Sequence, residues 1–244
     1  MATWAAGERE LGQSMLKSIL VSAAFGVAVV VACATPVFGQ TPKVEASVFG
    51  GWVFSDGVSG QNVLAGDGKL YNRVDPKDSG SFGFSISGYG SHDVEYGFMY
   101  GRQFSRLVIS GQDERDLGSL ATMNYHGYVS VVFGDSHAKV RPFALGGAGV
   151  THFGEVTTTT VAGVTRVIGG QTQFSTKWGA GVKIFPSPRV GLRVAFSWVP
   201  TYIKSDPGGW WCDPYWGCYS VGSSQYSNQF EFSGGVTFRL GGGK

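Results

Sequence analysis

Charge is scarce in this sequence, and the little that is present is balanced. Only 15% of the 244 residues are Asp, Glu, Lys or Arg, against roughly 25% in an ordinary soluble domain. The 19 basic and 17 acidic residues leave a net charge of +2, so there is no basic excess to attract nucleic acid. Glycine, by contrast, reaches 39 residues and aromatic residues 14%. This mixture is typical of a glycine-rich, aromatic-rich β protein.

Helical periodicity is also missing after Gln40, where apolar and polar residues alternate with a period of two instead. The last segment is the clearest, because Phe230, Phe232 and Phe238 alternate with polar residues such as Glu231 and Arg239. Seven further segments upstream behave similarly, although the glycine-rich segment 139–152 does not reveal which face is apolar. The eight predicted strands lie near residues 44–54, 80–90, 94–104, 119–133, 139–152, 173–185, 190–202 and 229–240. The sequence therefore predicts an all-β protein.

The N-terminus carries the one long charge-free apolar run, Ser18 to Val31, directly behind Lys17. A positive residue before such a run is typical of a secretory signal peptide. We expect residues 1–39 to be this signal peptide, with cleavage after Gly39. Acidic residues at positions 8 and 10 do not suit the start of a signal peptide, which makes Met15 a candidate for the true start.

Two alternatives to cleavage after Gly39 stay open. One is an uncleaved membrane anchor, although the run is short for a spanning helix of about 20 residues. The other is a lipoprotein site at Cys33, which lacks the usual leucine three residues upstream. Cleavage after Gly39 removes Cys33 and leaves Cys212 and Cys218, and two cysteines in an exported protein normally form a disulfide.

The connections between the predicted strands alternate in length. Those from the second to third, fourth to fifth and sixth to seventh strands are tight, whereas the others are long. In an up-and-down barrel alternate connections lie at the same rim, so all long loops share one end. Outer-membrane barrels have this asymmetry, with short periplasmic turns and long external loops.

The polar face of the strands decides which side faces lipid. A soluble barrel would carry many charged residues on its outer face, but here the polar face is mainly Gly and Ser, which suit the crowded interior of a small barrel. The apolar face carries aromatic residues near strand ends, as in the interfacial girdles of membrane barrels. These residues are Trp52, Phe54, Phe133, Trp198 and Phe238. We predict an eight-stranded antiparallel transmembrane β-barrel spanning residues 40–244.

The chain also resembles the eight-stranded outer-membrane β-barrels of the outer-membrane protein A and porin-like kind. The segments that carry the resemblance are 140–143 with 146–149, 178–183, 190–193 and 234–240. The resemblance implies an outer-membrane location in a Gram-negative-type bacterium, contact with outer-membrane lipid and lipopolysaccharide, and recognition of the C-terminal strand by the barrel-assembly machinery. Such barrels usually end on an aromatic residue; this chain ends in Leu240 and four further residues, so Phe238 is the candidate substitute.

Several charged residues fall on the predicted inner face. They are Glu45, Glu95, Lys177, Lys183, Arg193, Glu231 and Arg239, with Arg141 as a further candidate. Because isolated buried charge is costly, we expect these side chains to pair across the lumen. Glu45 and Arg239 are the best-supported pair, since the first strand begins beside the end of the last. Such pairs either form a structural plug or gate a narrow pore, and eight strands favour the plug because side chains fill their interior.

His126 is the only candidate for catalysis within a strand. Some outer-membrane barrels deacylate lipid A with a histidine and a serine two residues further on, but Tyr128 occupies that position here and Ser130 follows at four. The nucleophile and base required for acyl transfer are therefore not evident. The glycine-rich run 146–149 precedes no helix, which excludes a nucleotide loop. We predict no catalytic residue, cofactor or metal site.

Two long connections carry further signals. Residues 155–168 read as a barrel hairpin that continues beyond the membrane. The seventh-to-eighth connection contains Cys212 and Cys218 and five aromatic residues: Trp210, Trp211, Tyr215, Trp216 and Tyr219. Too few ligands flank the cysteines for zinc, and a redox pair would usually be spaced Cys-x-x-Cys. We expect a disulfide-closed loop whose aromatic rings either cover the barrel mouth or form an exposed contact patch for a surface ligand.

Overall fold

A computed structural model describes residues 44–64, 68–91, 93–134, 138–159, 165–203, 212–213, 217–218 and 225–240. The predicted signal peptide and the five loop aromatic residues 210, 211, 215, 216 and 219 lie outside these ranges, so both predictions stay open.

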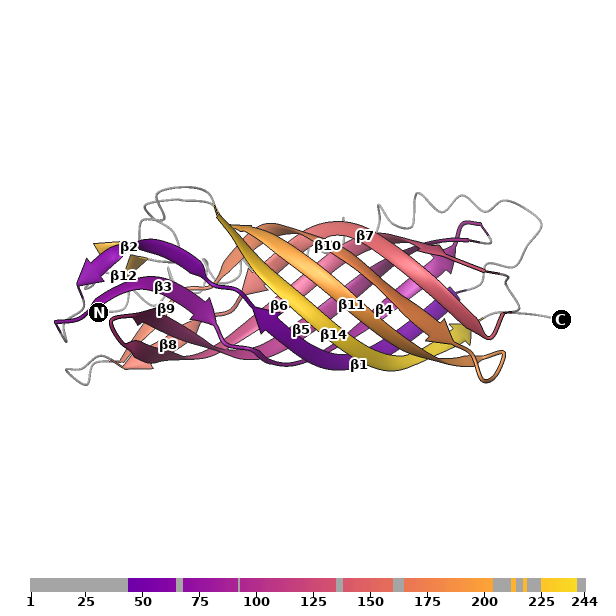
Figure 1. The fold of residues 1–244 in the computed structure, drawn as a ribbon, viewed down its shortest axis with the longest axis horizontal. Coiled ribbons are helices and arrows are strands. Elements are labelled where there is room, and N and C mark those ends of the chain that lie inside the picture. Colours follow the sequence, from indigo (N-terminus) through magenta and orange to yellow (C-terminus); the bar gives the residue numbers. More distant parts are fainter. Residues whose placement is uncertain are drawn as a thin grey trace, which may run out of the picture. The chain divides into compact units, whose positions relative to one another are not determined.

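Eight long strands form a closed antiparallel barrel, which confirms the predicted fold class (Figure 1). The strands are β1 (Val44–Ser55), β4 (Ser79–Tyr89), β5 (Val94–Gly111), β6 (Glu114–Val132), β7 (Val140–Phe153), β10 (Gln171–Ile184), β11 (Val190–Ile203) and β14 (Gln225–Leu240). Pairing of β1 with β14 closes the barrel. The register followed once around from Phe54 returns to β1 at Val44, a stagger of ten residues. Such a stagger tilts the strands against the barrel axis.

Short strands extend the barrel at the end with the long connections (Figure 1). They are β2 (Val58–Leu64), β3 (Leu70–Pro76), β8 (Val156–Thr159) and β9 (Thr165–Ile168). Two further short strands, β12 (Cys212–Asp213) and β13 (Gly217–Cys218), pair with each other in the connection between β11 and β14. The β8–β9 hairpin is the one expected within residues 155–168. The β2–β3 hairpin was not expected. It forms because β5 runs past the end of β4 and β3 pairs with the exposed edge, where Pro76 lies opposite Leu107.

Side chains alternate between lumen and exterior as predicted for a membrane barrel. The outer face is apolar, with Trp52, Phe84 and Phe196 each about half exposed, whereas the charged side chains of the inner face are buried apart from Arg239 at the rim, which is partly exposed. The polarity of the two faces reverses beyond the barrel end of β5, where the inward-pointing residues Leu107 and Ile109 are apolar and buried. That end is therefore built like a water-soluble β protein. The described part of the chain contains no helical segment with the length and hydrophobicity of a membrane span.

Glycine makes room for aromatic side chains in the lumen. Phe49 points inward from β1 and is buried. A Cβ atom on Gly83 would lie 2.6 Å from the Phe49 ring and 2.3 Å from the carbonyl oxygen of Tyr100. The close approach explains why the inner face of β4 carries glycine at this position.

Candidate functional site

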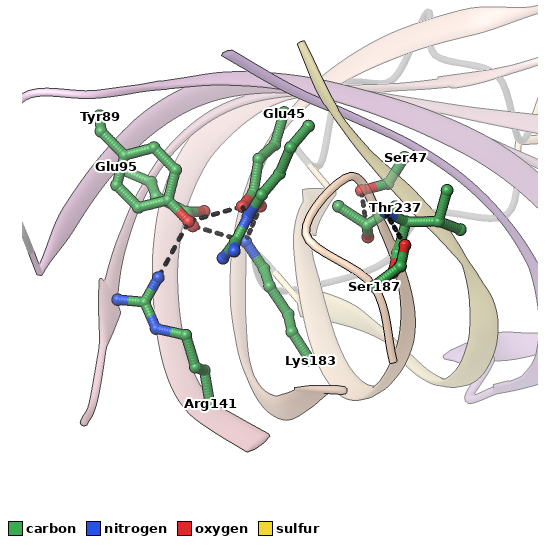
Figure 2. A network of polar contacts seen from close by, with 10 residues as sticks. Glu45, Ser47, Tyr89, Glu95, Arg141, Lys183, Ser187 and Thr237 are labelled. Carbon is green, nitrogen blue, oxygen red and sulfur yellow. Dashed lines mark hydrogen bonds and ion pairs between the residues drawn. The ribbon is translucent and has the colours of Figure 1, made fainter. Parts of the chain in front are cut away.

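The lumen contains an ionic cluster near the rim with the short turns. Lys183 Nζ lies 2.6 Å from Glu45 Oε2 and 2.5 Å from Glu95 Oε1. The other Glu45 oxygen accepts a hydrogen bond from Arg239 Nε at 2.9 Å. These side chains come from four strands, β1, β5, β10 and β14, and Figure 2 shows Glu45, Glu95 and Lys183 converging in the barrel interior. The cluster therefore bridges the lumen and also links β1 to β14.

Tyr89 and Arg141 extend this cluster. The Tyr89 hydroxyl donates to Glu45 Oε1 at 2.7 Å, and Arg141 Nη1 donates to the Tyr89 oxygen at 3.5 Å (Figure 2). The guanidinium carbon of Arg239 lies 3.5 Å from the centre of the Phe185 ring. Each acid of the cluster thus has a cation or a hydroxyl donor, which is the condition for tolerating buried charge.

A second ionic pair lies farther along the lumen. Lys177 Nζ lies 3.0 Å from Glu231 Oε2, and the Ser81 hydroxyl donates to Glu231 Oε1 at 2.8 Å. Both Lys177 and Glu231 are buried. Together the two groups hold Glu45, Glu95 and Glu231, the three acids that the sequence places on the inner face.

Arg193 departs from the expected pairing. Within the described ranges it has no carboxylate within 4.0 Å; its Nη1 instead donates to Ser85 Oγ at 3.3 Å. The guanidinium carbon lies 5.7 Å from the centre of the Phe49 ring and 4.9 Å from that of Phe143. Aromatic faces attract a cation through the ring quadrupole, so two rings replace the carboxylate that was expected.

A chain of hydrogen bonds between uncharged side chains crosses the lumen beyond the Lys177–Glu231 pair. His126 Nε2 lies 2.9 Å from Ser175 Oγ, which lies 2.9 Å from Thr151 Oγ1. Thr151 donates to Asn124 Oδ1 at 2.7 Å, and Asn124 donates to Gln229 Oε1 at 3.2 Å. The chain continues from Gln229 to Gln103 and from Gln103 to Ser55. These side chains fill the cross-section of the barrel.

An apolar cluster closes the lumen at the extended end. It contains Val58, Tyr71, Val74, Leu107, Ile109, Leu120, Phe153, Val156 and Ile203. The residues come from the barrel strands and from the added hairpins, so the hairpins cover the end of the polar lumen. Along the lumen, the described side chains thus form a charged layer, a neutral polar layer and an apolar layer.

Ion pairs occupy the outer surface of the extended end. Arg106 donates a hydrogen bond to Asp116 and holds the pKa of that carboxyl below its usual range. Lys69 likewise contacts Asp113 and lowers the pKa of its carboxyl. Lys77 Nζ lies 2.7 Å from Glu114 Oε1. These pairs are exposed to solvent, so each contributes little to stability.

The described part of the chain contains no group of three or more His, Cys, Asp or Glu side chains that could hold a metal ion. His126 and Ser175 are both almost completely buried. Their hydrogen bond belongs to the neutral chain of the lumen, away from the lipid-facing surface where a lipid substrate would lie.

The backbone of the cysteine loop is described only at four residues. Cys212 lies opposite Cys218 in the register of β12 and β13, and Asp213 lies opposite Gly217. This pairing brings the two cysteine backbones together. The disulfide itself remains a prediction.

Comparison with known proteins supports the fold. No protein-family model matches the sequence, and no curated protein matches it significantly. Among solved structures, outer membrane protein OprG from Pseudomonas aeruginosa aligns with a TM-score of 0.56 at 10% identity, over 83% of this chain and 98% of that chain. Outer membrane protein AlkL, solved in lipid bilayers, aligns with a TM-score of 0.50 at 16% identity, over 86% of this chain and 95% of that chain.

The chain has the fold of the outer-membrane β-barrels. In barrels of this fold the apolar outer face is the one that contacts lipid.

Sequence reasoning identified the charged lumen residues but missed several of their partners. Ser175, Gln103 and Tyr89 belong to the network and were not singled out. Serine and glutamine on the inner face carry no charge pattern that would distinguish them from other small polar residues. Tyr89 is the last residue of β4 and follows the inward-facing Ser87 by two positions, so the alternation continued to the strand end would have placed it inside.

Proposed function

We propose that the protein is a structural outer-membrane barrel with a closed lumen, and that its external end makes contacts with the cell's surroundings. The observation that carries this proposal is the position of Lys183 between Glu45 and Glu95, 2.6 and 2.5 Å from their carboxylate oxygens. A cation held by two acids from different strands crosses the lumen and joins its walls. Opening a pore along this path requires that buried charges separate, which is costly.

The construction of the external end supports a role in surface contact. The β2–β3 and β8–β9 hairpins extend the barrel, and the apolar cluster around Leu107 and Leu120 holds this extension together. A packed core makes the extension a rigid platform for the loops that it carries. The predicted ligand-contacting surface includes the aromatic residues near Cys212 and Cys218.

A small-solute channel is the second candidate function. It would require the ionic cluster around Lys183 and the chain through Gln229 and Gln103 to rearrange together. A lipid A-modifying enzyme is a weaker candidate, because the contact of His126 with Ser175 is buried in the lumen and Nε2 of the histidine is occupied by this hydrogen bond.

Membrane fractionation with gel electrophoresis tests the proposal. The protein should be recovered in the outer-membrane fraction, and unboiled samples should migrate differently from boiled ones, because a closed barrel resists unfolding by detergent. Removal of the tip of the cysteine loop should preserve this heat-modifiable migration while reducing binding at the cell surface. Release of the protein as a soluble periplasmic monomer would contradict the proposal.

A further inference from the structure

Arg102 is a cation on the lipid-facing surface of the barrel. It lies on β5 between the outward-facing residues Tyr100 and Phe104. The outward residues that precede it on this strand, from Tyr96 to Tyr100, are all aromatic. Phe82 of β4 and Met123 of β6 are its register partners on either side. Arg102 therefore projects outward from the apolar, lipid-facing band of side chains around the barrel, which we call the apolar belt, and not into the lumen.

The height of Arg102 corresponds to the external edge of this belt. If the stagger of ten residues is spread evenly over the eight strands, Arg102 lies level with Trp52 of β1 and Trp198 of β11. Both tryptophans are exposed on the outer face. Tryptophan collects at membrane–water interfaces, where its ring meets lipid and its N–H meets polar groups. A charge costs much less at this depth than at the centre of the bilayer.

Aromatic rings form a platform around the arginine. Its guanidinium carbon lies 5.2 Å from the centre of the Phe104 ring. Phe104 in turn stacks on Phe82 with ring centres 5.7 Å apart, and Phe82 contacts Tyr100 edge-on. This platform restricts the guanidinium and gives it a defined orientation at the interface.

Arg102 differs from neighbouring cations because no acid pairs with it among the described residues. Farther out, Arg106 contacts Asp116, Lys77 contacts Glu114, and Arg73 contacts two aspartates. The Nε atom of Arg102 is buried without a hydrogen-bond partner in the described part of the chain. A guanidinium offers a planar set of donors that matches a phosphate group.

We propose that Arg102, on its platform of Phe82, Tyr100 and Phe104, binds the phosphate group of an anionic glycolipid in the outer leaflet. The acyl chains of the lipid would lie along the aromatic face of β4, β5 and β6. This inference rests on the proposed outer-membrane location and on the long connections facing outward. It adds a specific lipid contact on the outside of the barrel, separate from the loops.

The test uses the full-length protein folded in neutral-lipid nanodiscs, with lipid A as the probe. Native mass spectrometry would compare retention of lipid A carrying its phosphates with retention of dephosphorylated lipid A. Arg102→Gln should weaken binding of the phosphorylated lipid roughly tenfold, as expected for the loss of a charge-assisted hydrogen bond. Arg102→Lys should retain part of the binding. Arg106→Gln is the matched control and should leave binding unchanged, since that arginine is already paired with Asp116.

Three results would overturn the inference: equal retention of the two lipids by the unaltered protein, unchanged binding by Arg102→Gln, or an equal loss in Arg106→Gln. Displacement of lipid A by millimolar inorganic phosphate would indicate a site for free anions and would also overturn it. Heat-modifiable migration of each variant reports folding separately. Loss of that migration in the unaltered protein would contradict the barrel itself, whereas intact migration without lipid selectivity would contradict only the role of Arg102.

Discussion

Glu45 and Arg239 are register partners on the first and last strands of the barrel, and Arg239 Nε donates to Glu45 Oε1 across 2.9 Å. The contact lies on the lumen side of the seam where β1 meets β14. Because Glu45 also binds Lys183, closure of the barrel and blockage of its lumen depend on the same carboxylate.

Glu45→Gln should therefore destabilise the folded barrel. The amide keeps the shape of the side chain but removes the charge that faces Lys183 and Arg239, and breaking a buried ion pair typically costs about 3–5 kcal/mol. Unfolding by guanidinium chloride would show this as a lower midpoint. Glu114→Gln breaks the exposed contact with Lys77 and should cost no more than ~1 kcal/mol. Equal shifts in the two variants would refute a special role of the lumen cluster.

Gly83→Ala should also destabilise the barrel, because the added Cβ would lie 2.6 Å from the Phe49 ring. Overpacking of a tightly filled interior typically costs about 1–3 kcal/mol. Gly88→Ala, on the same strand, is the control, since its Cβ would meet nothing within 4 Å. The temperature at which heat-modifiable migration is lost measures both effects. An unchanged temperature for Gly83→Ala would show that the Phe49 ring and the backbone at Tyr100 can both shift to admit the methyl group.

His126→Phe should lower stability without changing the lipid A of the cell. The substitution removes the hydrogen bond to Ser175, which is worth roughly 1 kcal/mol in a buried setting. His152→Phe removes an exposed hydrogen bond to Thr172 and should have a smaller effect. Mass spectrometry of lipid A from cells with each variant provides the chemical readout. A change in acylation that depends on His126 would establish the enzyme alternative.

The cysteine loop should contain no free thiol once the protein is exported. Cys212 and Cys218 are opposite each other in β12 and β13, and the predicted disulfide would close this short hairpin. Alkylation of the folded mature protein followed by intact-mass measurement should show no added label before reduction and two labels after it. Labelling before reduction would contradict the disulfide.

Trp211→Ala with Trp216→Ala should abolish surface binding if the rings form a contact patch, and should mainly loosen the loop if they cover the barrel mouth.

The barrel was predictable from sequence because the membrane imposes a simple pattern on most strands. Lipid requires apolar residues outside, and the narrow lumen accepts Ser, Gly and paired charges, so β4 and β14 alternate clearly over most of their length. The pairing of Glu45 with Arg239 followed from closure alone. The inner face of β7 could not be assigned, because Phe143 and Leu145 point into the lumen and are as apolar as the outward Val140.

The external extension was harder to predict because its apolar residues point inward and its charged residues point outward, the reverse of the pattern in the membrane. Beyond Gln103 the lumen side of β5 becomes apolar at Leu107 and Ile109, while Arg106 faces outward. The pattern expected of a lipid-facing strand therefore ends near residue 104, although β5 continues to Gly111. The sequence also did not predict that Arg193 contacts two aromatic rings and no carboxylate of the described residues. These contacts depend on how β1, β7 and β11 are placed around the lumen.

Planar-bilayer recording of the full-length protein tests most directly whether the lumen is closed. Heat-modifiable migration of the same preparation would first establish that the barrel is folded. With Lys183 held between Glu45 and Glu95, and with the apolar cluster covering the far end, we expect no steady open level. Long-lived, uniform conductance steps from the folded protein would contradict a closed lumen and would establish the channel alternative.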